Sequence, residues 1–127
     1  MTSITVPIRV RYSECDSMGV AHHGVYPVWF EIARTELLRA AGVAYAELER
    51  GGCPIVVVKL EASYKKPARY DDELQVTATV TRSSGVRIEH EYKVERAGVL
   101  LCTGKTTLAC LDRSGRPTAV PDKLRLK

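Results

Sequence analysis

The sequence has no long hydrophobic run. An apolar stretch such as Ile55 to Val58 falls far short of the roughly 20 residues that a membrane-spanning helix needs. The first residues, Met1 to Ile4, also lack the charged and apolar regions of a signal peptide. We therefore expect no membrane insertion and a cytoplasmic protein.

Metal-binding side chains are also scarce. The chain has three histidines, and its four cysteines are scattered without a CxxC pair: Cys15, Cys53, Cys102 and Cys110. This spacing matches no zinc site and favours free, mostly buried thiols over disulfides. His22 and His23 are adjacent, which permits a metal pair or a general base, but neighbouring loop histidines are usually only solvated. We therefore predict no metal.

The charge of the chain is moderately basic. It carries 19 basic and 15 acidic residues, with a net charge of +4 and a pI near 9.0, which suits nucleic acid or a phosphate-rich small ligand. The sequence lacks the aromatic and basic strand motif or the recognition helix of a nucleic-acid-binding protein, so we expect a small ligand. With 127 residues, 45% of them hydrophobic, the chain suffices for one domain over residues 1–127, ending in a basic tail, 118–127.

The N-terminal part is predicted to hold one strand and one long helix. Ile4 to Val10 alternates apolar and polar residues, as a half-buried strand does. From Gly24 to Ala41 the apolar spacing is helical, and one face is formed by Tyr26, Phe30, Ala33, Leu37 and Ala41. So apolar a helix should be largely enclosed by a sheet, with only a narrow charged stripe exposed. A short second helix is predicted over Ala44 to Arg50.

The remaining sequence is rich in Val, Thr, Ile and Tyr, as strands are. The predicted strands, separated by turn residues, cover 55–65, 73–83, 87–97 and 99–111. Short turns at Ser84-Gly85 and Ala97-Gly98 make the last three an antiparallel meander. This order of elements belongs to the α+β class. Because one helix cannot cover both faces of such a sheet, we expect a homo-oligomer in which another copy pairs with an open face or edge.

Asp16 lies in a turn, Cys15 to Gly19, shortly before the long helix. The free N–H groups at the start of a helix, with the positive end of its dipole, can hold an oxyanion. A carboxylate facing them suits acyl chemistry, so we predict an active site at this point. The alternative is that Asp16 only caps the helix or stabilises the turn, which is what an aspartate before a helix usually does.

Three segments, in this order and spacing, resemble one known family. They are the acid-rich turn Arg11 to Val20, the helix Phe30 to Arg39, and the segment Tyr64 to Leu74, which contains Pro-Ala-Arg-Tyr-Asp-Asp. Together they are similar to the hotdog-fold acyl-CoA thioesterases, in particular the 4-hydroxybenzoyl-CoA and Tol-Pal-associated groups. The likeness covers roughly Ile4 to Asp112. The chain departs from the family pattern at Glu14, where many relatives have Asp, and at His22, where an aromatic residue is common.

The resemblance implies a hotdog fold, in which a mainly antiparallel sheet of about five strands wraps one long helix. It implies that Asp16 is the catalytic carboxylate, either as a nucleophile or as a general base. It places the oxyanion donor at the backbone N–H of His23, with Gly24 as a second donor or as room for close approach. The expected reaction is hydrolysis of an acyl- or aryl-CoA thioester to free acid and CoA. No cofactor is implied, since CoA belongs to the substrate.

The resemblance also implies sites for the coenzyme and the acyl group. Family members bind the CoA nucleotide at surface loops, and the loop residues suited to phosphates here are Lys65, Lys66, Arg69, Arg82, Ser84 and Gly85. The alternative is that these cations serve solubility and edge protection, as Lys and Arg at strand ends often do. Tyr26 and Trp29 are candidates for an acyl pocket, although apolar residues at helical spacing more often form the core.

Other interpretations stay open. Glu31 and Glu36 are helix carboxylates of the kind that other hotdog branches use as catalysts, but a solvated role paired with arginine is favoured. A hotdog module that binds acyl-CoA or responds to it without hydrolysis would use Asp16 only as a cap. Aliphatic, aryl and acyl-carrier-protein thioesters all fit the sequence, as do dimers and tetramers.

Overall fold

The structure, a computed structural model, describes residues 2–43 and 45–124. Its elements, in chain order, are β1 (Ser3–Arg9), η1 (Tyr12–Glu14), η2 (His23–Val25), α1 (Tyr26–Ala40), α2 (Tyr45–Arg50), β2 (Ile55–Tyr64), β3 (Glu73–Ser84), β4 (Arg87–Arg96), β5 (Val99–Cys110) and η3 (Asp122–Leu124). This is the predicted α+β order. Ala44, the first residue of the predicted second helix, lies outside the described residues, and the rest of that helix is confirmed.

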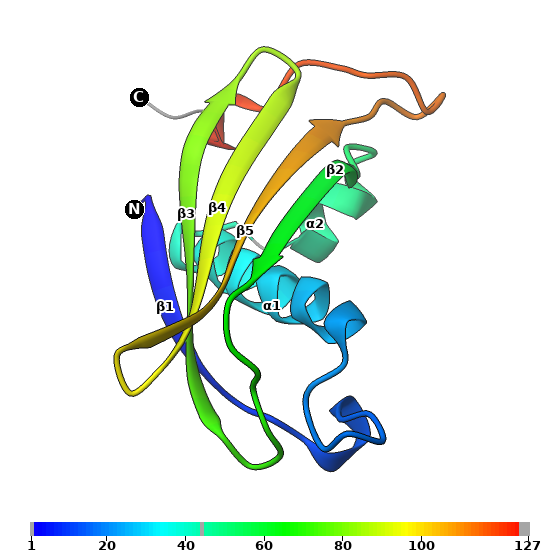
Figure 1. Ribbon diagram of the computed structural model, residues 1–127. Coiled ribbons are helices and arrows are strands. Elements are labelled where there is room, and N and C mark those ends of the chain that lie inside the picture. The colour runs from blue at the N-terminus through cyan, green and yellow to red at the C-terminus, as the bar shows by residue number, and fades with distance from the viewer. Residues whose placement is uncertain (1, 44, 125–127) are drawn as a thin grey trace.

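The five strands form one antiparallel sheet in the order β1-β3-β4-β5-β2 (Figure 1). The predicted meander of β3, β4 and β5 is therefore confirmed. In its second hairpin, Arg96 pairs with Val99 across Ala97 and Gly98, whose φ angles are 48° and 80°. Two successive positive φ angles are what a tight hairpin turn requires. The two edges of the sheet are β1, beside β3, and β2, beside β5.

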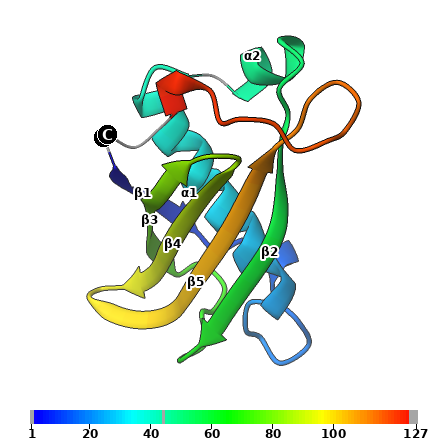
Figure 2. The same cartoon turned by 90° about the horizontal axis from the view of Figure 1, so that it is seen from above.

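Helix α1 lies across one face of the sheet (Figure 1 and Figure 2). Its buried residues are Tyr26, Trp29, Phe30, Ala33 and Leu37, which confirms most of the predicted apolar face. Ala41 is exposed because the helix ends at Ala40. The helix also begins later than predicted, because His23–Val25 form a 3₁₀ turn that leads into it.

The outer side of α1 is less polar than predicted. Val28 and Ile32 are exposed there, together with Glu31 and Arg39. The sheet of a single chain covers only one side of the helix. The prediction that the sheet encloses most of the helix and leaves only a narrow charged stripe exposed is therefore wrong for the chain alone. An exposed apolar strip on a helix needs a partner surface to leave water.

The helix approaches the sheet closely at β5. Gly104 lies against the Phe30 ring, and a Cβ atom at this position would overlap that ring. The Phe30 ring also stacks on the ring of Tyr92, with centroids 4.4 Å apart. The missing side chain of Gly104 thus allows the aromatic packing that joins α1 to the sheet.

A second, smaller core lies where the C-terminal segment returns to the sheet, and it consists of Ile88, Leu108, Cys110 and Val120. The N–H groups of Thr118 and Val120 donate to the carbonyls of Cys110 and Gly85 at 2.9 and 2.8 Å. The predicted basic tail, 118–127, therefore packs on the sheet as far as Leu124, and residues 125–127 lie outside the described residues.

All four cysteines are free, as predicted. Cys102 and Cys110 are buried, and burial raises the pKa of both thiols to about 11, so they stay protonated at neutral pH. Cys15 and Cys53 are half-buried. Among the helices that the structure describes, none combines the length and the apolar character needed to cross a membrane.

Candidate active site

Asp16 begins a tight loop between two short paired segments. Cys15 and Ala21 form an antiparallel bridge, and the N–H of Asp16 donates to the carbonyl of Val20 at 2.9 Å. Inside the loop, the N–H of Met18 donates to Oδ1 of Asp16 at 2.8 Å. The carboxylate is exposed, and its Oδ2 has no hydrogen-bond partner within residues 2–43 and 45–124. The loop thus presents a held carboxylate with one free oxygen.

The segment after this loop turns directly into the helix. The N–H of His22 donates to the carbonyl of Glu14 at 2.8 Å, and η2 then continues into α1. Pro27 lies in the first turn, and no side chain caps α1, which leaves the positive end of the helix dipole open. The N–H of His23 has no acceptor among the described residues, whereas the N–H of Gly24 donates to Nδ1 of His22 at 2.9 Å. The predicted first donor is therefore available, and the predicted second donor is engaged.

Sequence reasoning missed two residues of this region. Glu14, only 7% exposed, accepts hydrogen bonds from the N–H of Arg11 and the indole N–H of Trp29 at 2.7 and 3.1 Å. Tyr64, at the end of β2, donates its hydroxyl to the carbonyl of His23 at 2.8 Å. The signature of a capping box, Ser or Thr three residues before Glu, does not occur here because Arg11 holds the first position, so the local sequence carried little signal for Glu14. No local signal exists for Tyr64, because its contact joins residues 41 positions apart.

Burial and hydrogen bonding act in opposite directions on the charge of Glu14. Burial by itself would raise the pKa of this carboxyl group, because the charged form loses hydration. The hydrogen bonds from Arg11 and Trp29, with the positive charge of Arg11, outweigh burial and lower the pKa below its ordinary value. Glu14 is therefore a buried carboxylate that stays ionised at neutral pH.

A basic turn, defined here as Lys65, Lys66 and Arg69, follows β2 and lies beside the Asp16 loop. Arg69 forms an antiparallel bridge with Val20, and Val20 is the residue whose carbonyl accepts the N–H of Asp16. Asp16 and Arg69 are thus separated by two strand spacings, about 10 Å. Phosphate-binding cations predicted from the sequence and the predicted carboxylate are brought to the same end of the molecule.

Asp72 fixes the shape of the basic turn. Its Oδ2 accepts the N–H of Arg69 at 2.8 Å and pairs with Nη1 of Arg96 at 2.7 Å. Burial acts to raise the pKa of Asp72, but these hydrogen bonds and the nearby arginines lower it overall. The side chains of the basic turn are exposed, so their charges are available to a ligand.

The other predicted phosphate ligands, Arg82, Ser84 and Gly85, lie at the opposite end of the sheet (Figure 1). They form the β3–β4 hairpin, whereas the basic turn precedes β3. The 12 residues of β3 span about 40 Å at roughly 3.3 Å per residue. Within one chain the two groups therefore do not form one phosphate site, because successive turns of an antiparallel sheet alternate between its ends.

The two residues predicted to line an acyl pocket lie in the core of the chain. Trp29 is fully buried and Tyr26 nearly so. The Tyr26 ring contacts Trp29 and Tyr64 edge to face, with centroids 4.7 and 5.1 Å apart. Burial raises the pKa of Tyr26, so its hydroxyl stays protonated. In the single chain these rings support the start of α1, and a role in a pocket wall stays a prediction.

The two helix carboxylates have different surroundings. Oε1 of Glu36 pairs with Nη1 of Arg39 at 2.8 Å, as expected for a solvated pair, and Glu31 is exposed.

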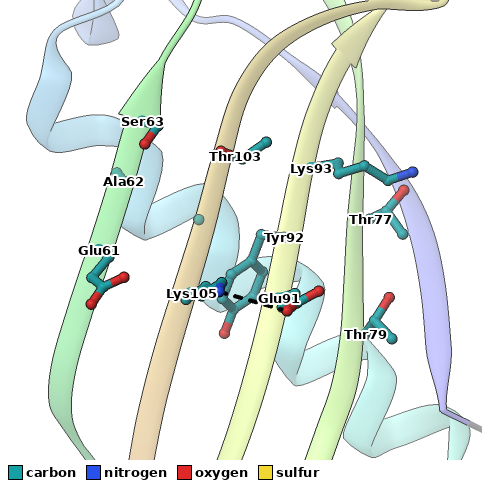
Figure 3. A pocket seen from close by; sticks show the side chains of 11 residues that line it. Glu61, Ala62, Ser63, Thr77, Thr79, Glu91, Tyr92, Lys93, Thr103 and Lys105 are labelled. Carbon is teal, nitrogen blue, oxygen red and sulfur yellow. Dashed lines mark ion pairs between the residues drawn. The ribbon is translucent and has the colours of Figure 1, made fainter.

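A hollow of about 360 Å³ lies on the face of the sheet turned away from α1 (Figure 3). Polar side chains of neighbouring strands border it, among them Thr77, Thr79, Lys93, Glu91 and Lys105; the last two approach to 3.9 Å. None of the lining residues belongs to the Asp16 loop or to the basic turn, so we do not place the substrate there.

Residues 10–127 match a protein family that is described as the thioesterase-like superfamily. The chain belongs to this superfamily. Among curated relatives, the acyl-CoA thioester hydrolase YbgC of Escherichia coli is 31% identical, over 93% of this chain and 90% of its own length. The acyl-CoA thioesterase YbgC of Haemophilus influenzae is 33% identical, over 94% of this chain and 89% of its own length.

Solved structures agree with the assignment to the thioesterase-like superfamily. The DHNA-CoA thioesterase of Staphylococcus aureus has a TM-score of 0.90 and 34% identity, covering 94% of this chain and 81% of its own. A hypothetical protein of Thermus thermophilus, TT1821, has a TM-score of 0.90 and 37% identity, with coverage of 94% and 92%. These likenesses confirm the predicted hotdog fold and the predicted enzyme class, a thioesterase.

Proposed function

We propose that this thioesterase hydrolyses an acyl- or aryl-CoA thioester to a free acid and CoA, with Asp16 as the reacting carboxylate. The observation that carries the proposal is the position of Asp16. Backbone pairing through Val20 and Ala21 holds its loop immediately before an uncapped helix start. An exposed carboxylate oxygen and a helix N-terminus are the base and the anion-binding site that acyl transfer needs.

In the proposed reaction, Asp16 takes a proton from water while the water oxygen bonds to the thioester carbonyl carbon. The carbon–sulfur bond then breaks, and CoA leaves as a thiolate, which becomes a thiol by taking up a proton. In the nucleophilic variant, the Asp16 carboxylate bonds to the carbonyl carbon, the carbon–sulfur bond breaks, and the CoA thiolate leaves. Water then hydrolyses the resulting anhydride to the free acid and restores Asp16. A thiolate leaves readily because its thiol has a pKa of about 8.5, so no strong general acid is required.

The oxyanion is assigned to the backbone N–H of His23. This group begins η2 and has no acceptor among the residues described, in contrast to the N–H of Gly24. Gly24 becomes a second donor only when Nδ1 of His22 releases it. The hydroxyl of Tyr64, bonded to the His23 carbonyl, restrains the next peptide and so favours a fixed direction for the donor.

We assign the CoA phosphates to the basic turn. It is the cationic cluster that the Val20–Arg69 bridge joins to the Asp16 loop, and its side chains are exposed. The backbones of Arg69 and Asp16 lie about two strand spacings apart, roughly 10 Å. Exposed cations that begin so close to the carboxylate suit the phosphates of an extended coenzyme whose thioester end reaches Asp16.

The proposed enzyme is a homo-oligomer that forms along β2. This ten-residue edge strand carries exposed Val56, Val57, Val58 and Leu60. An unpaired apolar edge is a template for pairing with another strand, and a second copy supplies the same edge.

The four free cysteines of the chain suit a reducing compartment, so we place the reaction in the cytoplasm.

One observation favours a second candidate, an acyl-CoA-binding module without catalysis. Oδ1 of Asp16 accepts the N–H of Met18 at 2.8 Å, which is the bond that a purely structural aspartate makes in a turn. In that case the carboxylate would stabilise the loop and take no part in chemistry.

The test is thiol release from a panel of short-chain, long-chain and aromatic acyl-CoA and acyl-carrier-protein thioesters, with wild type and Asp16→Asn compared. Asn keeps an oxygen for Met18 but can act neither as base nor as nucleophile. We expect turnover by wild type and a loss of about 100-fold or more in kcat for the variant, with little change in ligand binding. Full turnover by Asp16→Asn would reject its role, and binding of acyl-CoA without turnover by wild type would favour the binding module.

A further inference from the structure

We propose that Glu14 is the positioning residue that sets the geometry between Asp16 and the start of the helix. This inference rests on the proposed function, since it concerns the same site. Glu14 closes η1 and lies two residues before Asp16 in the chain. Its side chain is buried while that of Asp16 is exposed, so the two carboxylates serve opposite sides of one short segment.

The carboxylate of Glu14 ties two separate elements together. Oε1 accepts the backbone N–H of Arg11 at 2.7 Å, in the segment that follows β1. Oε2 accepts the indole N–H of Trp29, near the beginning of α1, at 3.1 Å, and Nη2 of Arg11 at 3.2 Å. Hydrogen bonds to an ionised group are shorter and stronger than neutral ones, and burial strengthens them further. The distance between the chain before Asp16 and the helix is thereby restrained.

The backbone of Glu14 restrains the third element, the segment that carries the oxyanion donor. Its carbonyl accepts the N–H of His22 at 2.8 Å, and His22 immediately precedes His23. Glu14 thus contacts the helix through its side chain, the donor segment through its carbonyl, and Asp16 through the chain. A shift of Glu14 would change the separation of the carboxylate from the donor, and a misplacement of about 1 Å can lower a rate about 100-fold.

An ionised carboxylate suits this position better than its neutral analogues. Both of its oxygens face N–H donors, and a carboxylate only accepts. A glutamine would direct its NH₂ group at one of these donors and lose that bond. An aspartate keeps the charge but is shorter by one carbon–carbon bond, about 1.5 Å, so from the same backbone it cannot reach both partners.

The test compares Glu14→Gln and Glu14→Asp with wild type on the best substrate of the panel. The matched control is Asp112→Asn, the same loss of charge at an aspartate that accepts two backbone N–H groups, those of Ser114 and Arg116, at 2.8 and 3.0 Å. Asp112 follows β5, at the end of the sheet opposite to the basic turn (Figure 1).

We expect Glu14→Gln to lower kcat about 10- to 100-fold while KM changes less than about threefold, because binding contacts remain. Glu14→Asp should recover part of kcat, and Asp112→Asn should leave both constants unchanged. Trp29→Phe, which removes only the indole N–H, should lower kcat less than Glu14→Gln. Added to Glu14→Gln, it should cause a smaller loss than it causes alone, since the two side chains share a hydrogen bond.

Amide hydrogen exchange provides a readout that does not depend on activity. In Glu14→Gln, the His22 amide should exchange about tenfold faster or more, while amides of β3 and β4 keep their protection. If wild type cleaves no thioester, the proposed function fails and this exchange result alone decides the positioning role. Wild-type kcat and unchanged His22 protection in Glu14→Gln, with Asp16→Asn inactive, would overturn the inference and leave the function intact. Faster exchange throughout the chain would show only a structural role and would also overturn it.

Discussion

Two of the buried polar side chains, Glu14 and His90, have different surroundings. Glu14, in η1 and 7% exposed, has partners for both oxygens. His90, in β4 and 5% exposed, has an Nδ1 atom without a hydrogen-bond partner in the part of the chain that is described. A buried polar atom without a partner lowers stability, whereas a satisfied one adds to the definition of the structure. The fully satisfied group is the one beside the candidate active site.

The two groups also differ in charge, although burial opposes the charged form of both. Hydrogen bonds to Glu14 outweigh burial and keep the carboxylate ionised. Burial, helped by the positive charge of Arg34, lowers the pKa of His90 to about 4, so the imidazole is neutral at pH 7. The nearby hydroxyl of Tyr92 bonds to Arg34 and Thr106 at 3.1 and 2.6 Å. The polar groups near His90 thus bond to one another and not to its Nδ1, whereas the donors that converge on Glu14 keep that carboxylate charged.

The strongest test of this comparison removes the satisfied group. Glu14→Ala leaves the indole N–H of Trp29 buried without an acceptor, and it should reduce the free energy of unfolding by about 3 kcal/mol at pH 7. Urea unfolding measures this change. The matched control is Glu73→Ala, which removes an exposed carboxylate paired with Arg9 at 2.8 Å and should change stability by less than about 1 kcal/mol. Equal effects would show that burial of Glu14 has no consequence.

The next test concerns pH. Between pH 6.5 and about 4 the unfolded state binds a proton at His90 and the folded state does not, so stability falls as pH falls. From pH 7 to pH 5 we expect a loss of about 2 kcal/mol in the free energy of unfolding. The lowered pKa values of Glu14 and Asp72 affect stability in a more acidic pH range. The stabilisation that these two carboxylates provide is complete above their ordinary pKa values and is lost only at lower pH.

Urea unfolding of His90→Leu at pH 7 and pH 5 isolates the contribution of His90 to the pH dependence of stability. The variant should lose most of the pH dependence, whereas His22→Gln, which changes an exposed histidine, should keep it. A wild-type protein equally stable at both pH values would contradict the buried neutral imidazole.

A third, smaller effect is expected where α1 meets the sheet. Gly104→Ala places a methyl group on the Phe30 ring, which cannot move freely because it stacks on Tyr92. Overpacking should reduce stability at the lower end of roughly 1–3 kcal/mol, since only one methyl is added. Thermal unfolding measures it, and Phe30→Leu in the same chain should relieve part of the loss. Additive losses from the two changes would show that they do not share this contact.

The smallest expected effect concerns which end of the sheet binds the coenzyme. Arg69→Ala should raise KM for an acyl-CoA substrate a few-fold, with kcat nearly unchanged and a weaker dependence of KM on salt. Arg82→Ala, at the opposite end, should leave KM unchanged. A larger effect from Arg82 than from Arg69 would indicate that the coenzyme binds at the β3–β4 hairpin.

The sequence by itself determined the local elements. Alternating residues in β1, helical spacing from Tyr26 to Leu37, and turn residues such as Ala97-Gly98 predicted the order of strands and helices, because these patterns act over a few residues. It also determined that Asp16 precedes the helix. The ends of α1 were less well predicted, since a 3₁₀ turn and the helix share one spacing over a few residues.

Only the tertiary structure decided which loops meet. Pairing of Val20 with Arg69 brought the basic turn to Asp16, while the length of β3 carried Arg82 and Gly85 to the far end. The contacts of Tyr64 with His23 and of Glu14 with Trp29 likewise join residues distant in sequence. The physical reason is that a local pattern specifies the shape of one element, whereas burial and the pairing of backbone groups across the whole sheet specify its neighbours.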